Sequence, residues 1–326
     1  MRIKLSPLLL LATCLTLSAQ TEEQTDKHFT VPANSQLIVD VGQGSLEVAT
    51  HARNEVIISA FRKVTRRSKA DEEAFLRDHP ITFSQDGSTL TIQANDQNSG
   101  SSWSWFGSNR TEAKYLITAP ATFNVRLKTS GGSIAVNDLT GKVNANTSGG
   151  GLRFARVRGP LDGHTSGGGI RVTECEGTIK INTSGGGIDV IDGSGTLEGD
   201  TSGGGINVKD FQGSAHVETS GGGINLENVT GQIYGSTSGG SINARFSLPL
   251  ADEVKLETSG GGVTVRVPES SAFNLDASTS GGEVSTDLPV TVVGKLSRSH
   301  LSGTVNGGSK PVYLRSSGGG IQVKKL

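Results

Sequence analysis

Apolar and polar residues alternate in two short stretches of a unit that recurs through residues 129–326. The unit begins Thr-Ser-Gly-Gly-Gly-Ile, or a close variant, and returns every 18 residues from Thr129 to Thr237. Its sixth, eighth and fifteenth positions are apolar, as in Ile188, Val190 and Leu197, and polar residues lie between them. Such alternation is typical of strands with one buried face. Each unit therefore predicts two short strands, at positions six to eight and fourteen to eighteen.

Self-similarity at a fixed short period predicts a stacked repeat architecture. One unit would not fold alone, because ordering its residues costs roughly 27 kcal/mol, whereas about five inward side chains return ~10 kcal/mol. The rest of the free energy must come from contacts between neighbouring units. We therefore predict an all-β protein, a single-stranded parallel β-solenoid (β-helix) with 18-residue coils. The general rule for crossover connections favours right-handed winding.

The first and thirteenth positions of the unit are the candidate structural residues. The Thr position lies an even number of residues from the apolar positions of its strand, so its side chain should point inward and form a ladder whose hydroxyls bond the corner backbone. The alternative is an array of Thr side chains that binds ice or a polymer, which would need a flat outward face. Glycine at the two corners is expected to supply positive φ. The Thr ladder comprises Thr147, Thr165, Thr183, Thr201 and Thr219, and the thirteenth column comprises Gly141, Gly159, Gly177, Gly195, Gly213 and Gly231.

Residues 1–20 resemble an export signal. Arg2 precedes the mostly apolar stretch from Leu5 to Leu17, and Ser18 and Ala19 offer a cleavage site. The stretch is short for a membrane span, and no second apolar segment follows, so we expect no transmembrane segment in the mature chain. Cys14 lies in a sequence like a lipoprotein cleavage box, but the apolar run continues beyond it, which argues against lipid anchoring.

Residues 21–128 form a non-repetitive, β-rich region that we expect to cap the solenoid of residues 129–326. Ser68 to Asp71 is typical of a capping box that opens a short helix, and Gly42 to Val48 resembles a degenerate coil. A cap here would protect open strand edges. At the other end, the basic strand from Ile321 to Leu326 is expected to be the last strand and to discourage end-to-end stacking.

A polar, Gly/Ser-rich loop is predicted for residues 95–111, and it contains the candidate binding residues Trp103, Trp105 and Phe106. These aromatic side chains either fold back onto the rod or contact a carbohydrate or a membrane, as exposed aromatics on loops do. The sequence leaves both interpretations open.

Charge and cysteine content exclude several classes of protein. The 30 Lys and Arg residues nearly balance the 31 Asp and Glu residues, so the basic footprint of a nucleic-acid-binding protein is missing. After removal of the signal, Cys175 is the one cysteine left, in an otherwise apolar column, and we interpret it as a core residue. The outward columns show no convergent carboxylate pair, and the histidines form no ligand cluster. We therefore expect no enzymatic activity, no metal and no cofactor.

The Thr-Ser-Gly-Gly-Gly-Ile coils, with Phe29 to Pro32 and Gly44 to Val48, resemble an exported β-strand-repeat family of adhesins of unknown function (domain of unknown function 4097). The resemblance implies no catalytic residues, and a link of some relatives to envelope stress implies a role at the cell envelope. Two functions remain: an adhesin-like interaction protein that binds a glycan or an envelope protein, and a structural or envelope-stress scaffold in the periplasm. A polysaccharide-active β-helix enzyme is a less favoured third. We expect a monomer in the periplasm or on the cell surface.

Overall fold

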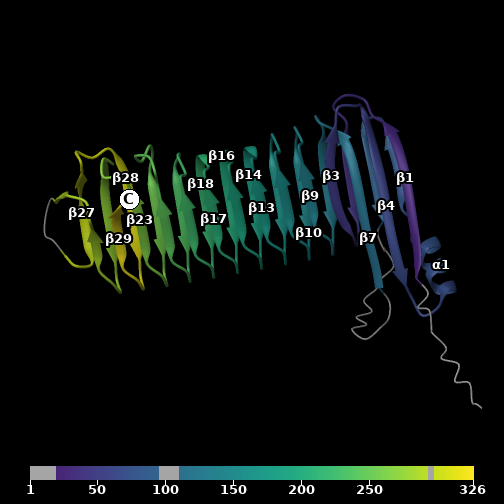
Figure 1. The fold of residues 1–326 in the computed structure, drawn as a ribbon. Coiled ribbons are helices and arrows are strands. Elements are labelled where there is room, and N and C mark those ends of the chain that lie inside the picture. Colours follow the sequence, from purple (N-terminus) through teal and green to yellow (C-terminus); the bar gives the residue numbers. More distant parts are fainter. Residues whose placement is uncertain (1–19, 95–109, 293–296) are drawn as a thin grey trace, which may run out of the picture.

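Two long, mainly parallel sheets run side by side along the chain and enclose one apolar core. The computed structural model describes residues 20–94, 110–292 and 297–326. Figure 1 shows the sheets as a rod, with a taller group of strands and the helix α1 (Lys69–Asp78) at the N-terminal end. The protein is therefore all-β and solenoid-like, as the alternation of apolar and polar residues predicted.

Sheet A has 14 strands in the spatial order β1-β4-β7-β3-β9-β11-β13-β15-β17-β19-β21-β23-β29-β25. Their bounds are β1 (Thr21–Thr30), β3 (Ser45–His51), β4 (Glu55–Thr65), β7 (Arg110–Pro120), β9 (Ile134–Asn137), β11 (Leu152–Ala155), β13 (Ile170–Thr173), β15 (Ile188–Ile191), β17 (Ile206–Lys209), β19 (Ile224–Glu227), β21 (Ile242–Arg245), β23 (Val263–Val267), β25 (Val284–Thr286) and β29 (Ile321–Lys325).

Sheet B has 15 strands in the order β26-β27-β24-β28-β22-β20-β18-β16-β14-β12-β10-β8-β2-β6-β5. Their bounds are β2 (Gln36–Val41), β5 (Thr82–Asp86), β6 (Thr89–Ala94), β8 (Asn124–Thr129), β10 (Val143–Thr147), β12 (Leu161–Thr165), β14 (Glu176–Thr183), β16 (Ser194–Thr201), β18 (Gln212–Thr219), β20 (Ile233–Thr237), β22 (Val254–Thr258), β24 (Phe273–Thr279), β26 (Val290–Val292), β27 (His300–Val305) and β28 (Lys310–Ser316).

Equivalent strands of neighbouring coils pair in parallel, so each residue type forms a column along the rod. β10 aligns Val143 with Leu161 of β12, and Thr147 with Thr165. The apolar columns face the space between the sheets and are buried, so each coil covers the apolar side chains of the next. Cys175 occupies one of these columns, and burial raises the pKa of its thiol.

The Thr column lies at the ends of the sheet B strands, and its side chains are buried. Thr165 Oγ1 donates to the Gly150 carbonyl at 2.7 Å and accepts from the Gly168 N–H at 3.3 Å. One hydroxyl thus satisfies backbone groups of two successive corners. The same 2.7 Å bond to a glycine carbonyl recurs at Thr147, Thr183, Thr201 and Thr219.

The glycine run at this corner has a different role from the expected one. Gly149, Gly150 and Gly151 do not have positive φ. A Cβ atom on Gly150 would instead lie 2.2 Å from the Gly132 carbonyl oxygen of the preceding coil. The prediction of positive φ is therefore wrong for this corner, where glycine is needed because the backbones of adjacent coils nearly touch.

Positive φ occurs at the other corner, in two columns. In the thirteenth column, Gly141, Gly159, Gly177, Gly195 and Gly213 have φ between 115° and 146°, whereas Gly231 has no positive φ. The tenth column is left-handed although it lacks glycine: Asp138, Arg156, Glu174, Asp192, Asp210 and Asn228 have φ between 51° and 61°. Among residues other than glycine, Asp and Asn adopt this conformation most readily, and they hold four of the six positions. The sequence analysis did not identify this second column.

The N-terminal region continues both sheets and then adds antiparallel strands. β2 pairs in parallel with β8, and β3 with β9, so residues 36–51 form a rung of the same rod. β7, which the sequence analysis missed, pairs antiparallel with β4, and β4 pairs antiparallel with β1. Ser68 caps α1 as predicted, because its Oγ accepts from the Asp71 N–H at 3.2 Å.

The C-terminal coil lies between two earlier coils. β29 pairs with β23 on one side and β25 on the other, and β28 lies between β22 and β24 in the same way. Ile321–Lys325 is the last strand along the chain, as predicted, but it lies inside the rod and not at its end, so its basic residues do not guard that end. The last rung consists of β24 and β25, and β27 with β26 covers the edge of β24 (Figure 1).

Candidate functional site

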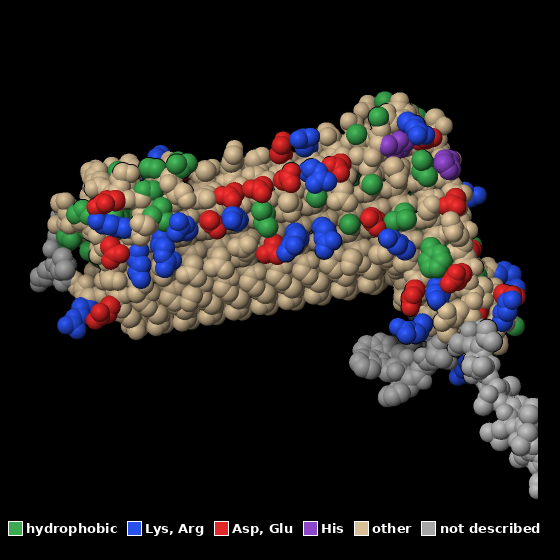
Figure 2. Space-filling model, viewed as in Figure 1, with side chains coloured by type: hydrophobic (Ala, Val, Ile, Leu, Met, Phe, Trp, Pro, Cys, Tyr) green, Lys and Arg blue, Asp and Glu red, His purple; other side chains and the backbone are tan. Residues whose placement is uncertain are grey.

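Charged side chains on the outer faces pair from one coil to the next. Arg171 Nη2 lies 3.0 Å from Asp189 Oδ2, and Lys180 Nζ lies 2.8 Å from Glu198 Oε1. Figure 2 shows both signs mixed along the visible face, and a strip without charged or hydrophobic side chains where the Ser-Gly-Gly-Gly corners stack. Exposed pairs of this kind add little stability. Because positive and negative side chains are mixed, this face has no area with a single sign of charge.

Two neighbouring carboxylates lie on sheet B, which corrects the expectation that the outward columns hold no such pair. Asp200 of β16 is aligned with Glu218 of β18, and His216 Nε2 lies 3.1 Å from Glu218 Oε1. Burial raises the pKa of Asp200, and the negative charges of Glu218 and Glu198 raise it further. The sequence analysis compared the residues along sheet A and so missed this column.

An aromatic side chain on sheet B is enclosed by its neighbours. The Tyr234 ring lies 4.4 Å from the His216 ring, between centroids, and Lys255 Nζ lies 5.1 Å from the Tyr234 centroid. His216 and Lys255 are aligned with Tyr234 from the strands on either side. Stacking of a sugar ring needs a free aromatic face, and both faces of Tyr234 are flanked.

A pocket of about 410 Å³ opens at the corner between β21 and β22. The inserted residues Ser247 to Asp252 leave the regular path there, and the ladder resumes where the Ile233 N–H donates to the Glu253 carbonyl at 2.9 Å. The floor is apolar and buried, and it consists of Val229, Ile233, Phe246 and Val254. Leu248 lies at the mouth with 69% of its surface exposed. The inserted loop thus creates a cavity at this corner rather than a simple bulge.

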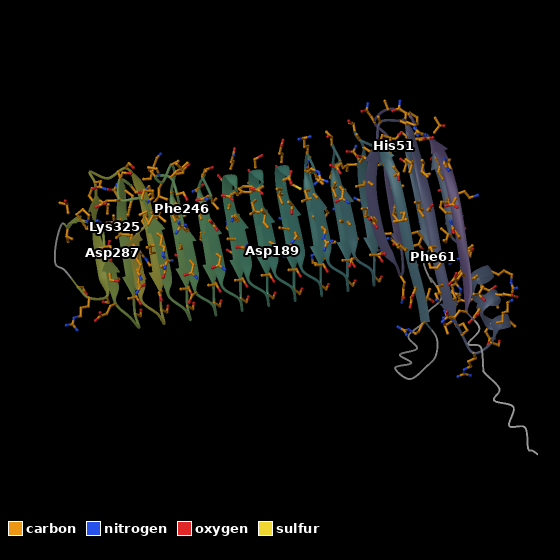
Figure 3. The ribbon with its side chains drawn as sticks, viewed as in Figure 1. His51, Phe61, Asp189, Phe246, Asp287 and Lys325 are labelled. Carbon is orange, nitrogen blue, oxygen red and sulfur yellow. The ribbon has the colours of Figure 1, made fainter. Side chains whose placement is uncertain are left out.

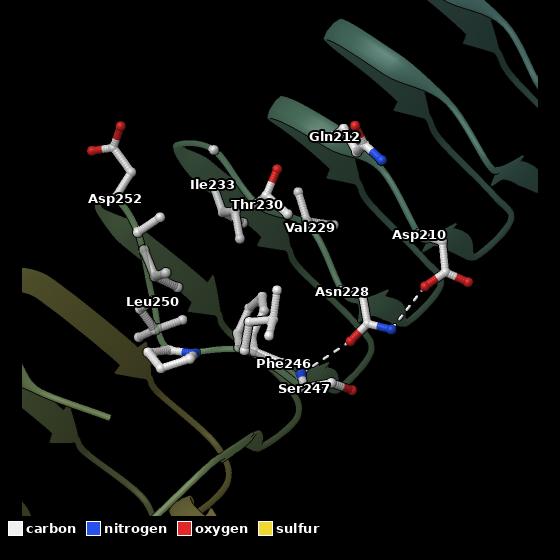
Figure 4. Close-up of a pocket in the computed structure, with 15 residues that line it drawn as sticks. Asp210, Gln212, Asn228, Val229, Thr230, Ile233, Phe246, Ser247, Leu250 and Asp252 are labelled. Atoms are coloured by element: carbon white, nitrogen blue, oxygen red, sulfur yellow. Dashed lines mark hydrogen bonds between the residues drawn. The ribbon is translucent and has the colours of Figure 1, made fainter. Parts of the chain in front are cut away.

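The polar side of the pocket is built around Asn228 (Figure 4). Its Nδ2 donates to Asp210 Oδ1 at 2.7 Å, and its Oδ1 accepts from the Ser247 N–H at 3.0 Å. Asn228 therefore holds the inserted loop against the preceding coil. Asp252 lies on the opposite side of the cavity (Figure 4), and the lining residues include no Lys, Arg or His.

The candidate aromatic residues Trp103, Trp105 and Phe106 lie outside the described residues, as do Cys14 and the predicted cleavage site. In the ranges that the structure describes, no group of three or more His, Cys, Asp or Glu side chains is placed to hold a metal ion. Neither is any helix in those ranges long and apolar enough to span a bilayer.

The amino-acid sequence of the repeat region and most of the preceding region matches a known family. The model of the family Toastrack DUF4097 matches residues 35–324. The chain belongs to this family. The resemblance found in the sequence is thereby confirmed for this Toastrack chain. A search of curated proteins found no match.

Three solved structures illustrate what this Toastrack chain is similar to. A candidate adhesin from Parabacteroides merdae is 12% identical, with a TM-score of 0.42 and coverage of 93% of this chain and 96% of that one. A candidate cell adhesion protein from Clostridium sporogenes is 12% identical, with a TM-score of 0.26 and coverage of 94% and 100%. A candidate lipid-binding protein from Parabacteroides distasonis is 14% identical, with a TM-score of 0.33 and coverage of 93% and 96%.

Proposed function

We propose that the protein is an exported, non-catalytic, adhesin-like interaction protein of the cell envelope. Its corner pocket receives an apolar side chain of a basic segment in an envelope protein. The proposal includes a right-handed solenoid of 18-residue coils and a signal peptide in residues 1–20, and it places the rod in the periplasm or on the cell surface.

The pocket carries this proposal. Its volume of about 410 Å³ falls in the range of ligand sites, which are mostly apolar with a few placed polar groups. The exposed Leu248 enlarges the apolar surface at the mouth, and exposed apolar patches commonly mark contact sites. Asp210 and Asp252 lie on the two sides without a basic residue in the lining, so a positively charged partner segment is favoured over an acidic one.

At Tyr234 a glycan is the less favoured partner, because the flanked ring offers no free face for sugar stacking. The acid pair of Asp200 and Glu218 does not favour a polysaccharide-active enzyme either. The two side chains project from adjacent strands on the same face of sheet B, whereas glycoside hydrolysis uses carboxylates that flank the scissile bond.

A scaffold in the periplasm is the second candidate function. The observation that favours it is the coil-to-coil pairing of charges, as between Lys180 and Glu198, which ties neighbouring coils together without creating a ligand site. A rod built this way serves to hold other components at a fixed separation.

Binding of two matched peptides to the purified mature chain tests the pocket. One acetylated tetrapeptide has two leucines between lysines, and the other has the same leucines between glutamates. We expect calorimetry to show saturable binding of the lysine peptide, and binding of the glutamate peptide that is at least about ten-fold weaker. Equal affinities, or no saturable binding of the lysine peptide, would overturn the proposed use of the pocket.

Three variants assign the binding to this corner. Leu248→Asp is expected to abolish binding by placing a charge at the apolar mouth, and its high exposure leaves the fold intact. Asp252→Asn is expected to reduce the preference for the lysine peptide. Asp189→Asn, on the outer face far along the rod (Figure 3), removes an equal charge and should leave binding unchanged. Loss of binding in Asp189→Asn as well would show that binding does not depend on this corner and would overturn the assignment.

A further inference from the structure

β1 presents a long open edge at the N-terminal end of sheet A. It is 10 residues long, contains no proline and pairs with β4 alone among the described strands. At the other end of the rod, the outermost strands β25 and β26 have 3 residues each. Native proteins normally keep edge strands short or blocked, because free backbone groups recruit another strand. The end formed by β1 (Figure 1) is therefore where this rod is able to add a strand.

The backbone groups of every second residue of β1 point away from β4. The Val31 N–H donates to the Asn54 carbonyl at 3.1 Å, and this pair continues the antiparallel register in which Thr25 faces Ala60. In such a ladder, hydrogen-bonded pairs alternate with pairs that make no bond. The odd-numbered residues therefore bond β4, and the outward N–H and C=O groups belong to Glu22, Gln24, Asp26, His28 and Thr30.

The open stretch is symmetric about Thr25. The Thr30 carbonyl already accepts from Gln85 Nε2 at 3.0 Å, so the free edge covers residues 22–28. Two glutamates begin this stretch, at positions 22 and 23, and Lys27 and His28 end it. Opposite charges on directly facing residues stabilise antiparallel pairs, so the stretch is complementary to itself when turned antiparallel.

We propose that β1 pairs antiparallel with β1 of a second copy, about a two-fold axis at Thr25. In this register Glu22 faces the partner's His28, and Glu23 faces the partner's Lys27. In this register every residue whose backbone groups point outward faces another such residue of the partner; Gln24, for example, faces the partner's Asp26. Glu23 also keeps its contact with Arg62 Nη2 at 2.5 Å, because one carboxylate accepts from two cations.

Neighbouring registers are less favourable. A shift by one residue places outward backbone groups opposite inward ones and breaks the ladder. A shift by two residues places Asp26 opposite the partner's Asp26 in one direction, and Glu22 opposite the partner's Asp26 in the other. Both put like charges in direct opposition, which is destabilising.

The helix α1 contacts β1 at Thr21, one residue before the free edge of residues 22–28. Glu72 of α1 accepts from Thr21 Oγ1 at 2.7 Å and from the Arg66 N–H at 3.0 Å. Arg62 of β4 donates through Nη1 to the His79 carbonyl at 2.6 Å, just after the helix. α1 is thus bound to the face of the β1–β4 pair through side chains of both strands.

The proposed dimer joins two rods at their N-terminal ends and directs the two corner pockets away from each other. This goes beyond the proposed function and replaces the expectation of a monomer. It does not depend on what the pockets bind, so the two proposals fail separately.

Sedimentation equilibrium of the purified mature chain tests the pairing. We expect a reversible monomer–dimer equilibrium, and a chain that stays monomeric up to about 100 μM, the upper end of weak specific association, would overturn the proposal. Gln24→Pro removes an outward N–H without touching the bonds to β4, so dimerisation should be lost. Gln24→Ala is the matched control and should dimerise normally; a Gln24→Pro chain that still dimerises would also overturn the proposal.

A charge exchange at one facing pair tests the register. His28→Glu places acid opposite acid, and Glu22→Lys replaces the carboxylate that faces the imidazole with an ammonium group, so each variant alone should dimerise roughly ten-fold more weakly or worse. An equimolar mixture of the two variants places the introduced carboxylate opposite the introduced ammonium group and restores the native Glu22–His28 pair, so it should dimerise as the native chain does. Recovery in the mixture shows that both variants are folded, and failure of the folded variants to recover would rule out this register.

Discussion

Arg156 donates two hydrogen bonds to Asp138 in the preceding coil, from Nε at 2.6 Å and from Nη2 at 3.0 Å. Both residues have left-handed backbone, with φ of 53° and 61°. Two non-glycine residues with left-handed backbone thus lie one above the other and form a planar, bidentate ion pair. The pair lowers the pKa of Asp138, chiefly through the hydrogen bonds from Arg156.

Asp138→Asn should lower stability at neutral pH and have a diminishing effect in acid. Because the pKa of Asp138 is depressed in the folded state, its contribution is complete above the ordinary carboxyl range and disappears as pH falls through the folded pKa. Thermal unfolding of native and variant chains at pH 7 and about pH 2.5 measures this. Asp86→Asn, on an exposed hairpin, is the control, and a gap that widened in acid would contradict the prediction.

Asp200→Asn should have the opposite effect at neutral pH. Burial and the charges of Glu218 and Glu198 raise the pKa of Asp200, so the folded state binds this proton more tightly than the unfolded chain, and stability falls as pH rises through the raised pKa. The variant should therefore be more stable than the native chain at pH 7 and equal to it near about pH 3. Asp162→Asn on β12 is the comparison, and a destabilised Asp200→Asn chain at pH 7 would show that the acid pair has a stabilising role.

Gly150→Ala should be far more damaging than Gly149→Ala, one residue earlier in the same corner. A Cβ at Gly150 would lie 2.2 Å from the Gly132 carbonyl oxygen, whereas a Cβ at Gly149 would lie 3.4 Å from the Gly131 carbonyl oxygen. We expect losses of about 3 kcal/mol or more for the first variant and within about 1 kcal/mol for the second, measured by urea unfolding. Similar losses in both would mean that backbone entropy, rather than coil contact, explains the glycine run.

Thr165→Val keeps the shape of the buried side chain but removes its hydroxyl. The Gly150 carbonyl and the Gly168 N–H then lose a partner, and each buried unsatisfied group is expected to cost about 1–3 kcal/mol. Thr165→Ser keeps the hydroxyl and should lose only about 1 kcal/mol, the value of one buried methyl group. Urea unfolding of both variants decides whether the hydroxyl or the methyl group matters more at this position.

The columns of the repeat were predictable because the period fixes register. Parity alone placed Thr165 and its equivalents inward at the strand ends, where the structure has them. The repeat length and the alternation of apolar and polar residues carry no information on the distance between two backbones. They therefore did not explain why position 150 is glycine. They also carry no signal for left-handed backbone at a residue such as Arg156.

The repeat length did not predict the order in which the last coils stack. Thr258, Thr279 and Ser316 begin near-identical units, and any of them satisfies the hydrogen bonds of the column, so the motif gives the register of a coil but not its neighbours. The cavity after Phe246 depends on the path that the inserted loop takes past Val229. That path is a property of packing between coils and not of the inserted residues alone.

The intercalated C-terminal coil imposes an order of assembly. Residues 273–286 leave the ribosome before residues 310–325. They reach their final neighbours only after the later segment has paired with β22 and β23. Most of the rod is able to grow rung by rung as it emerges. Its far end, in contrast, waits for the final stretch, so a chain that lost that stretch would leave an unfinished, strand-recruiting end.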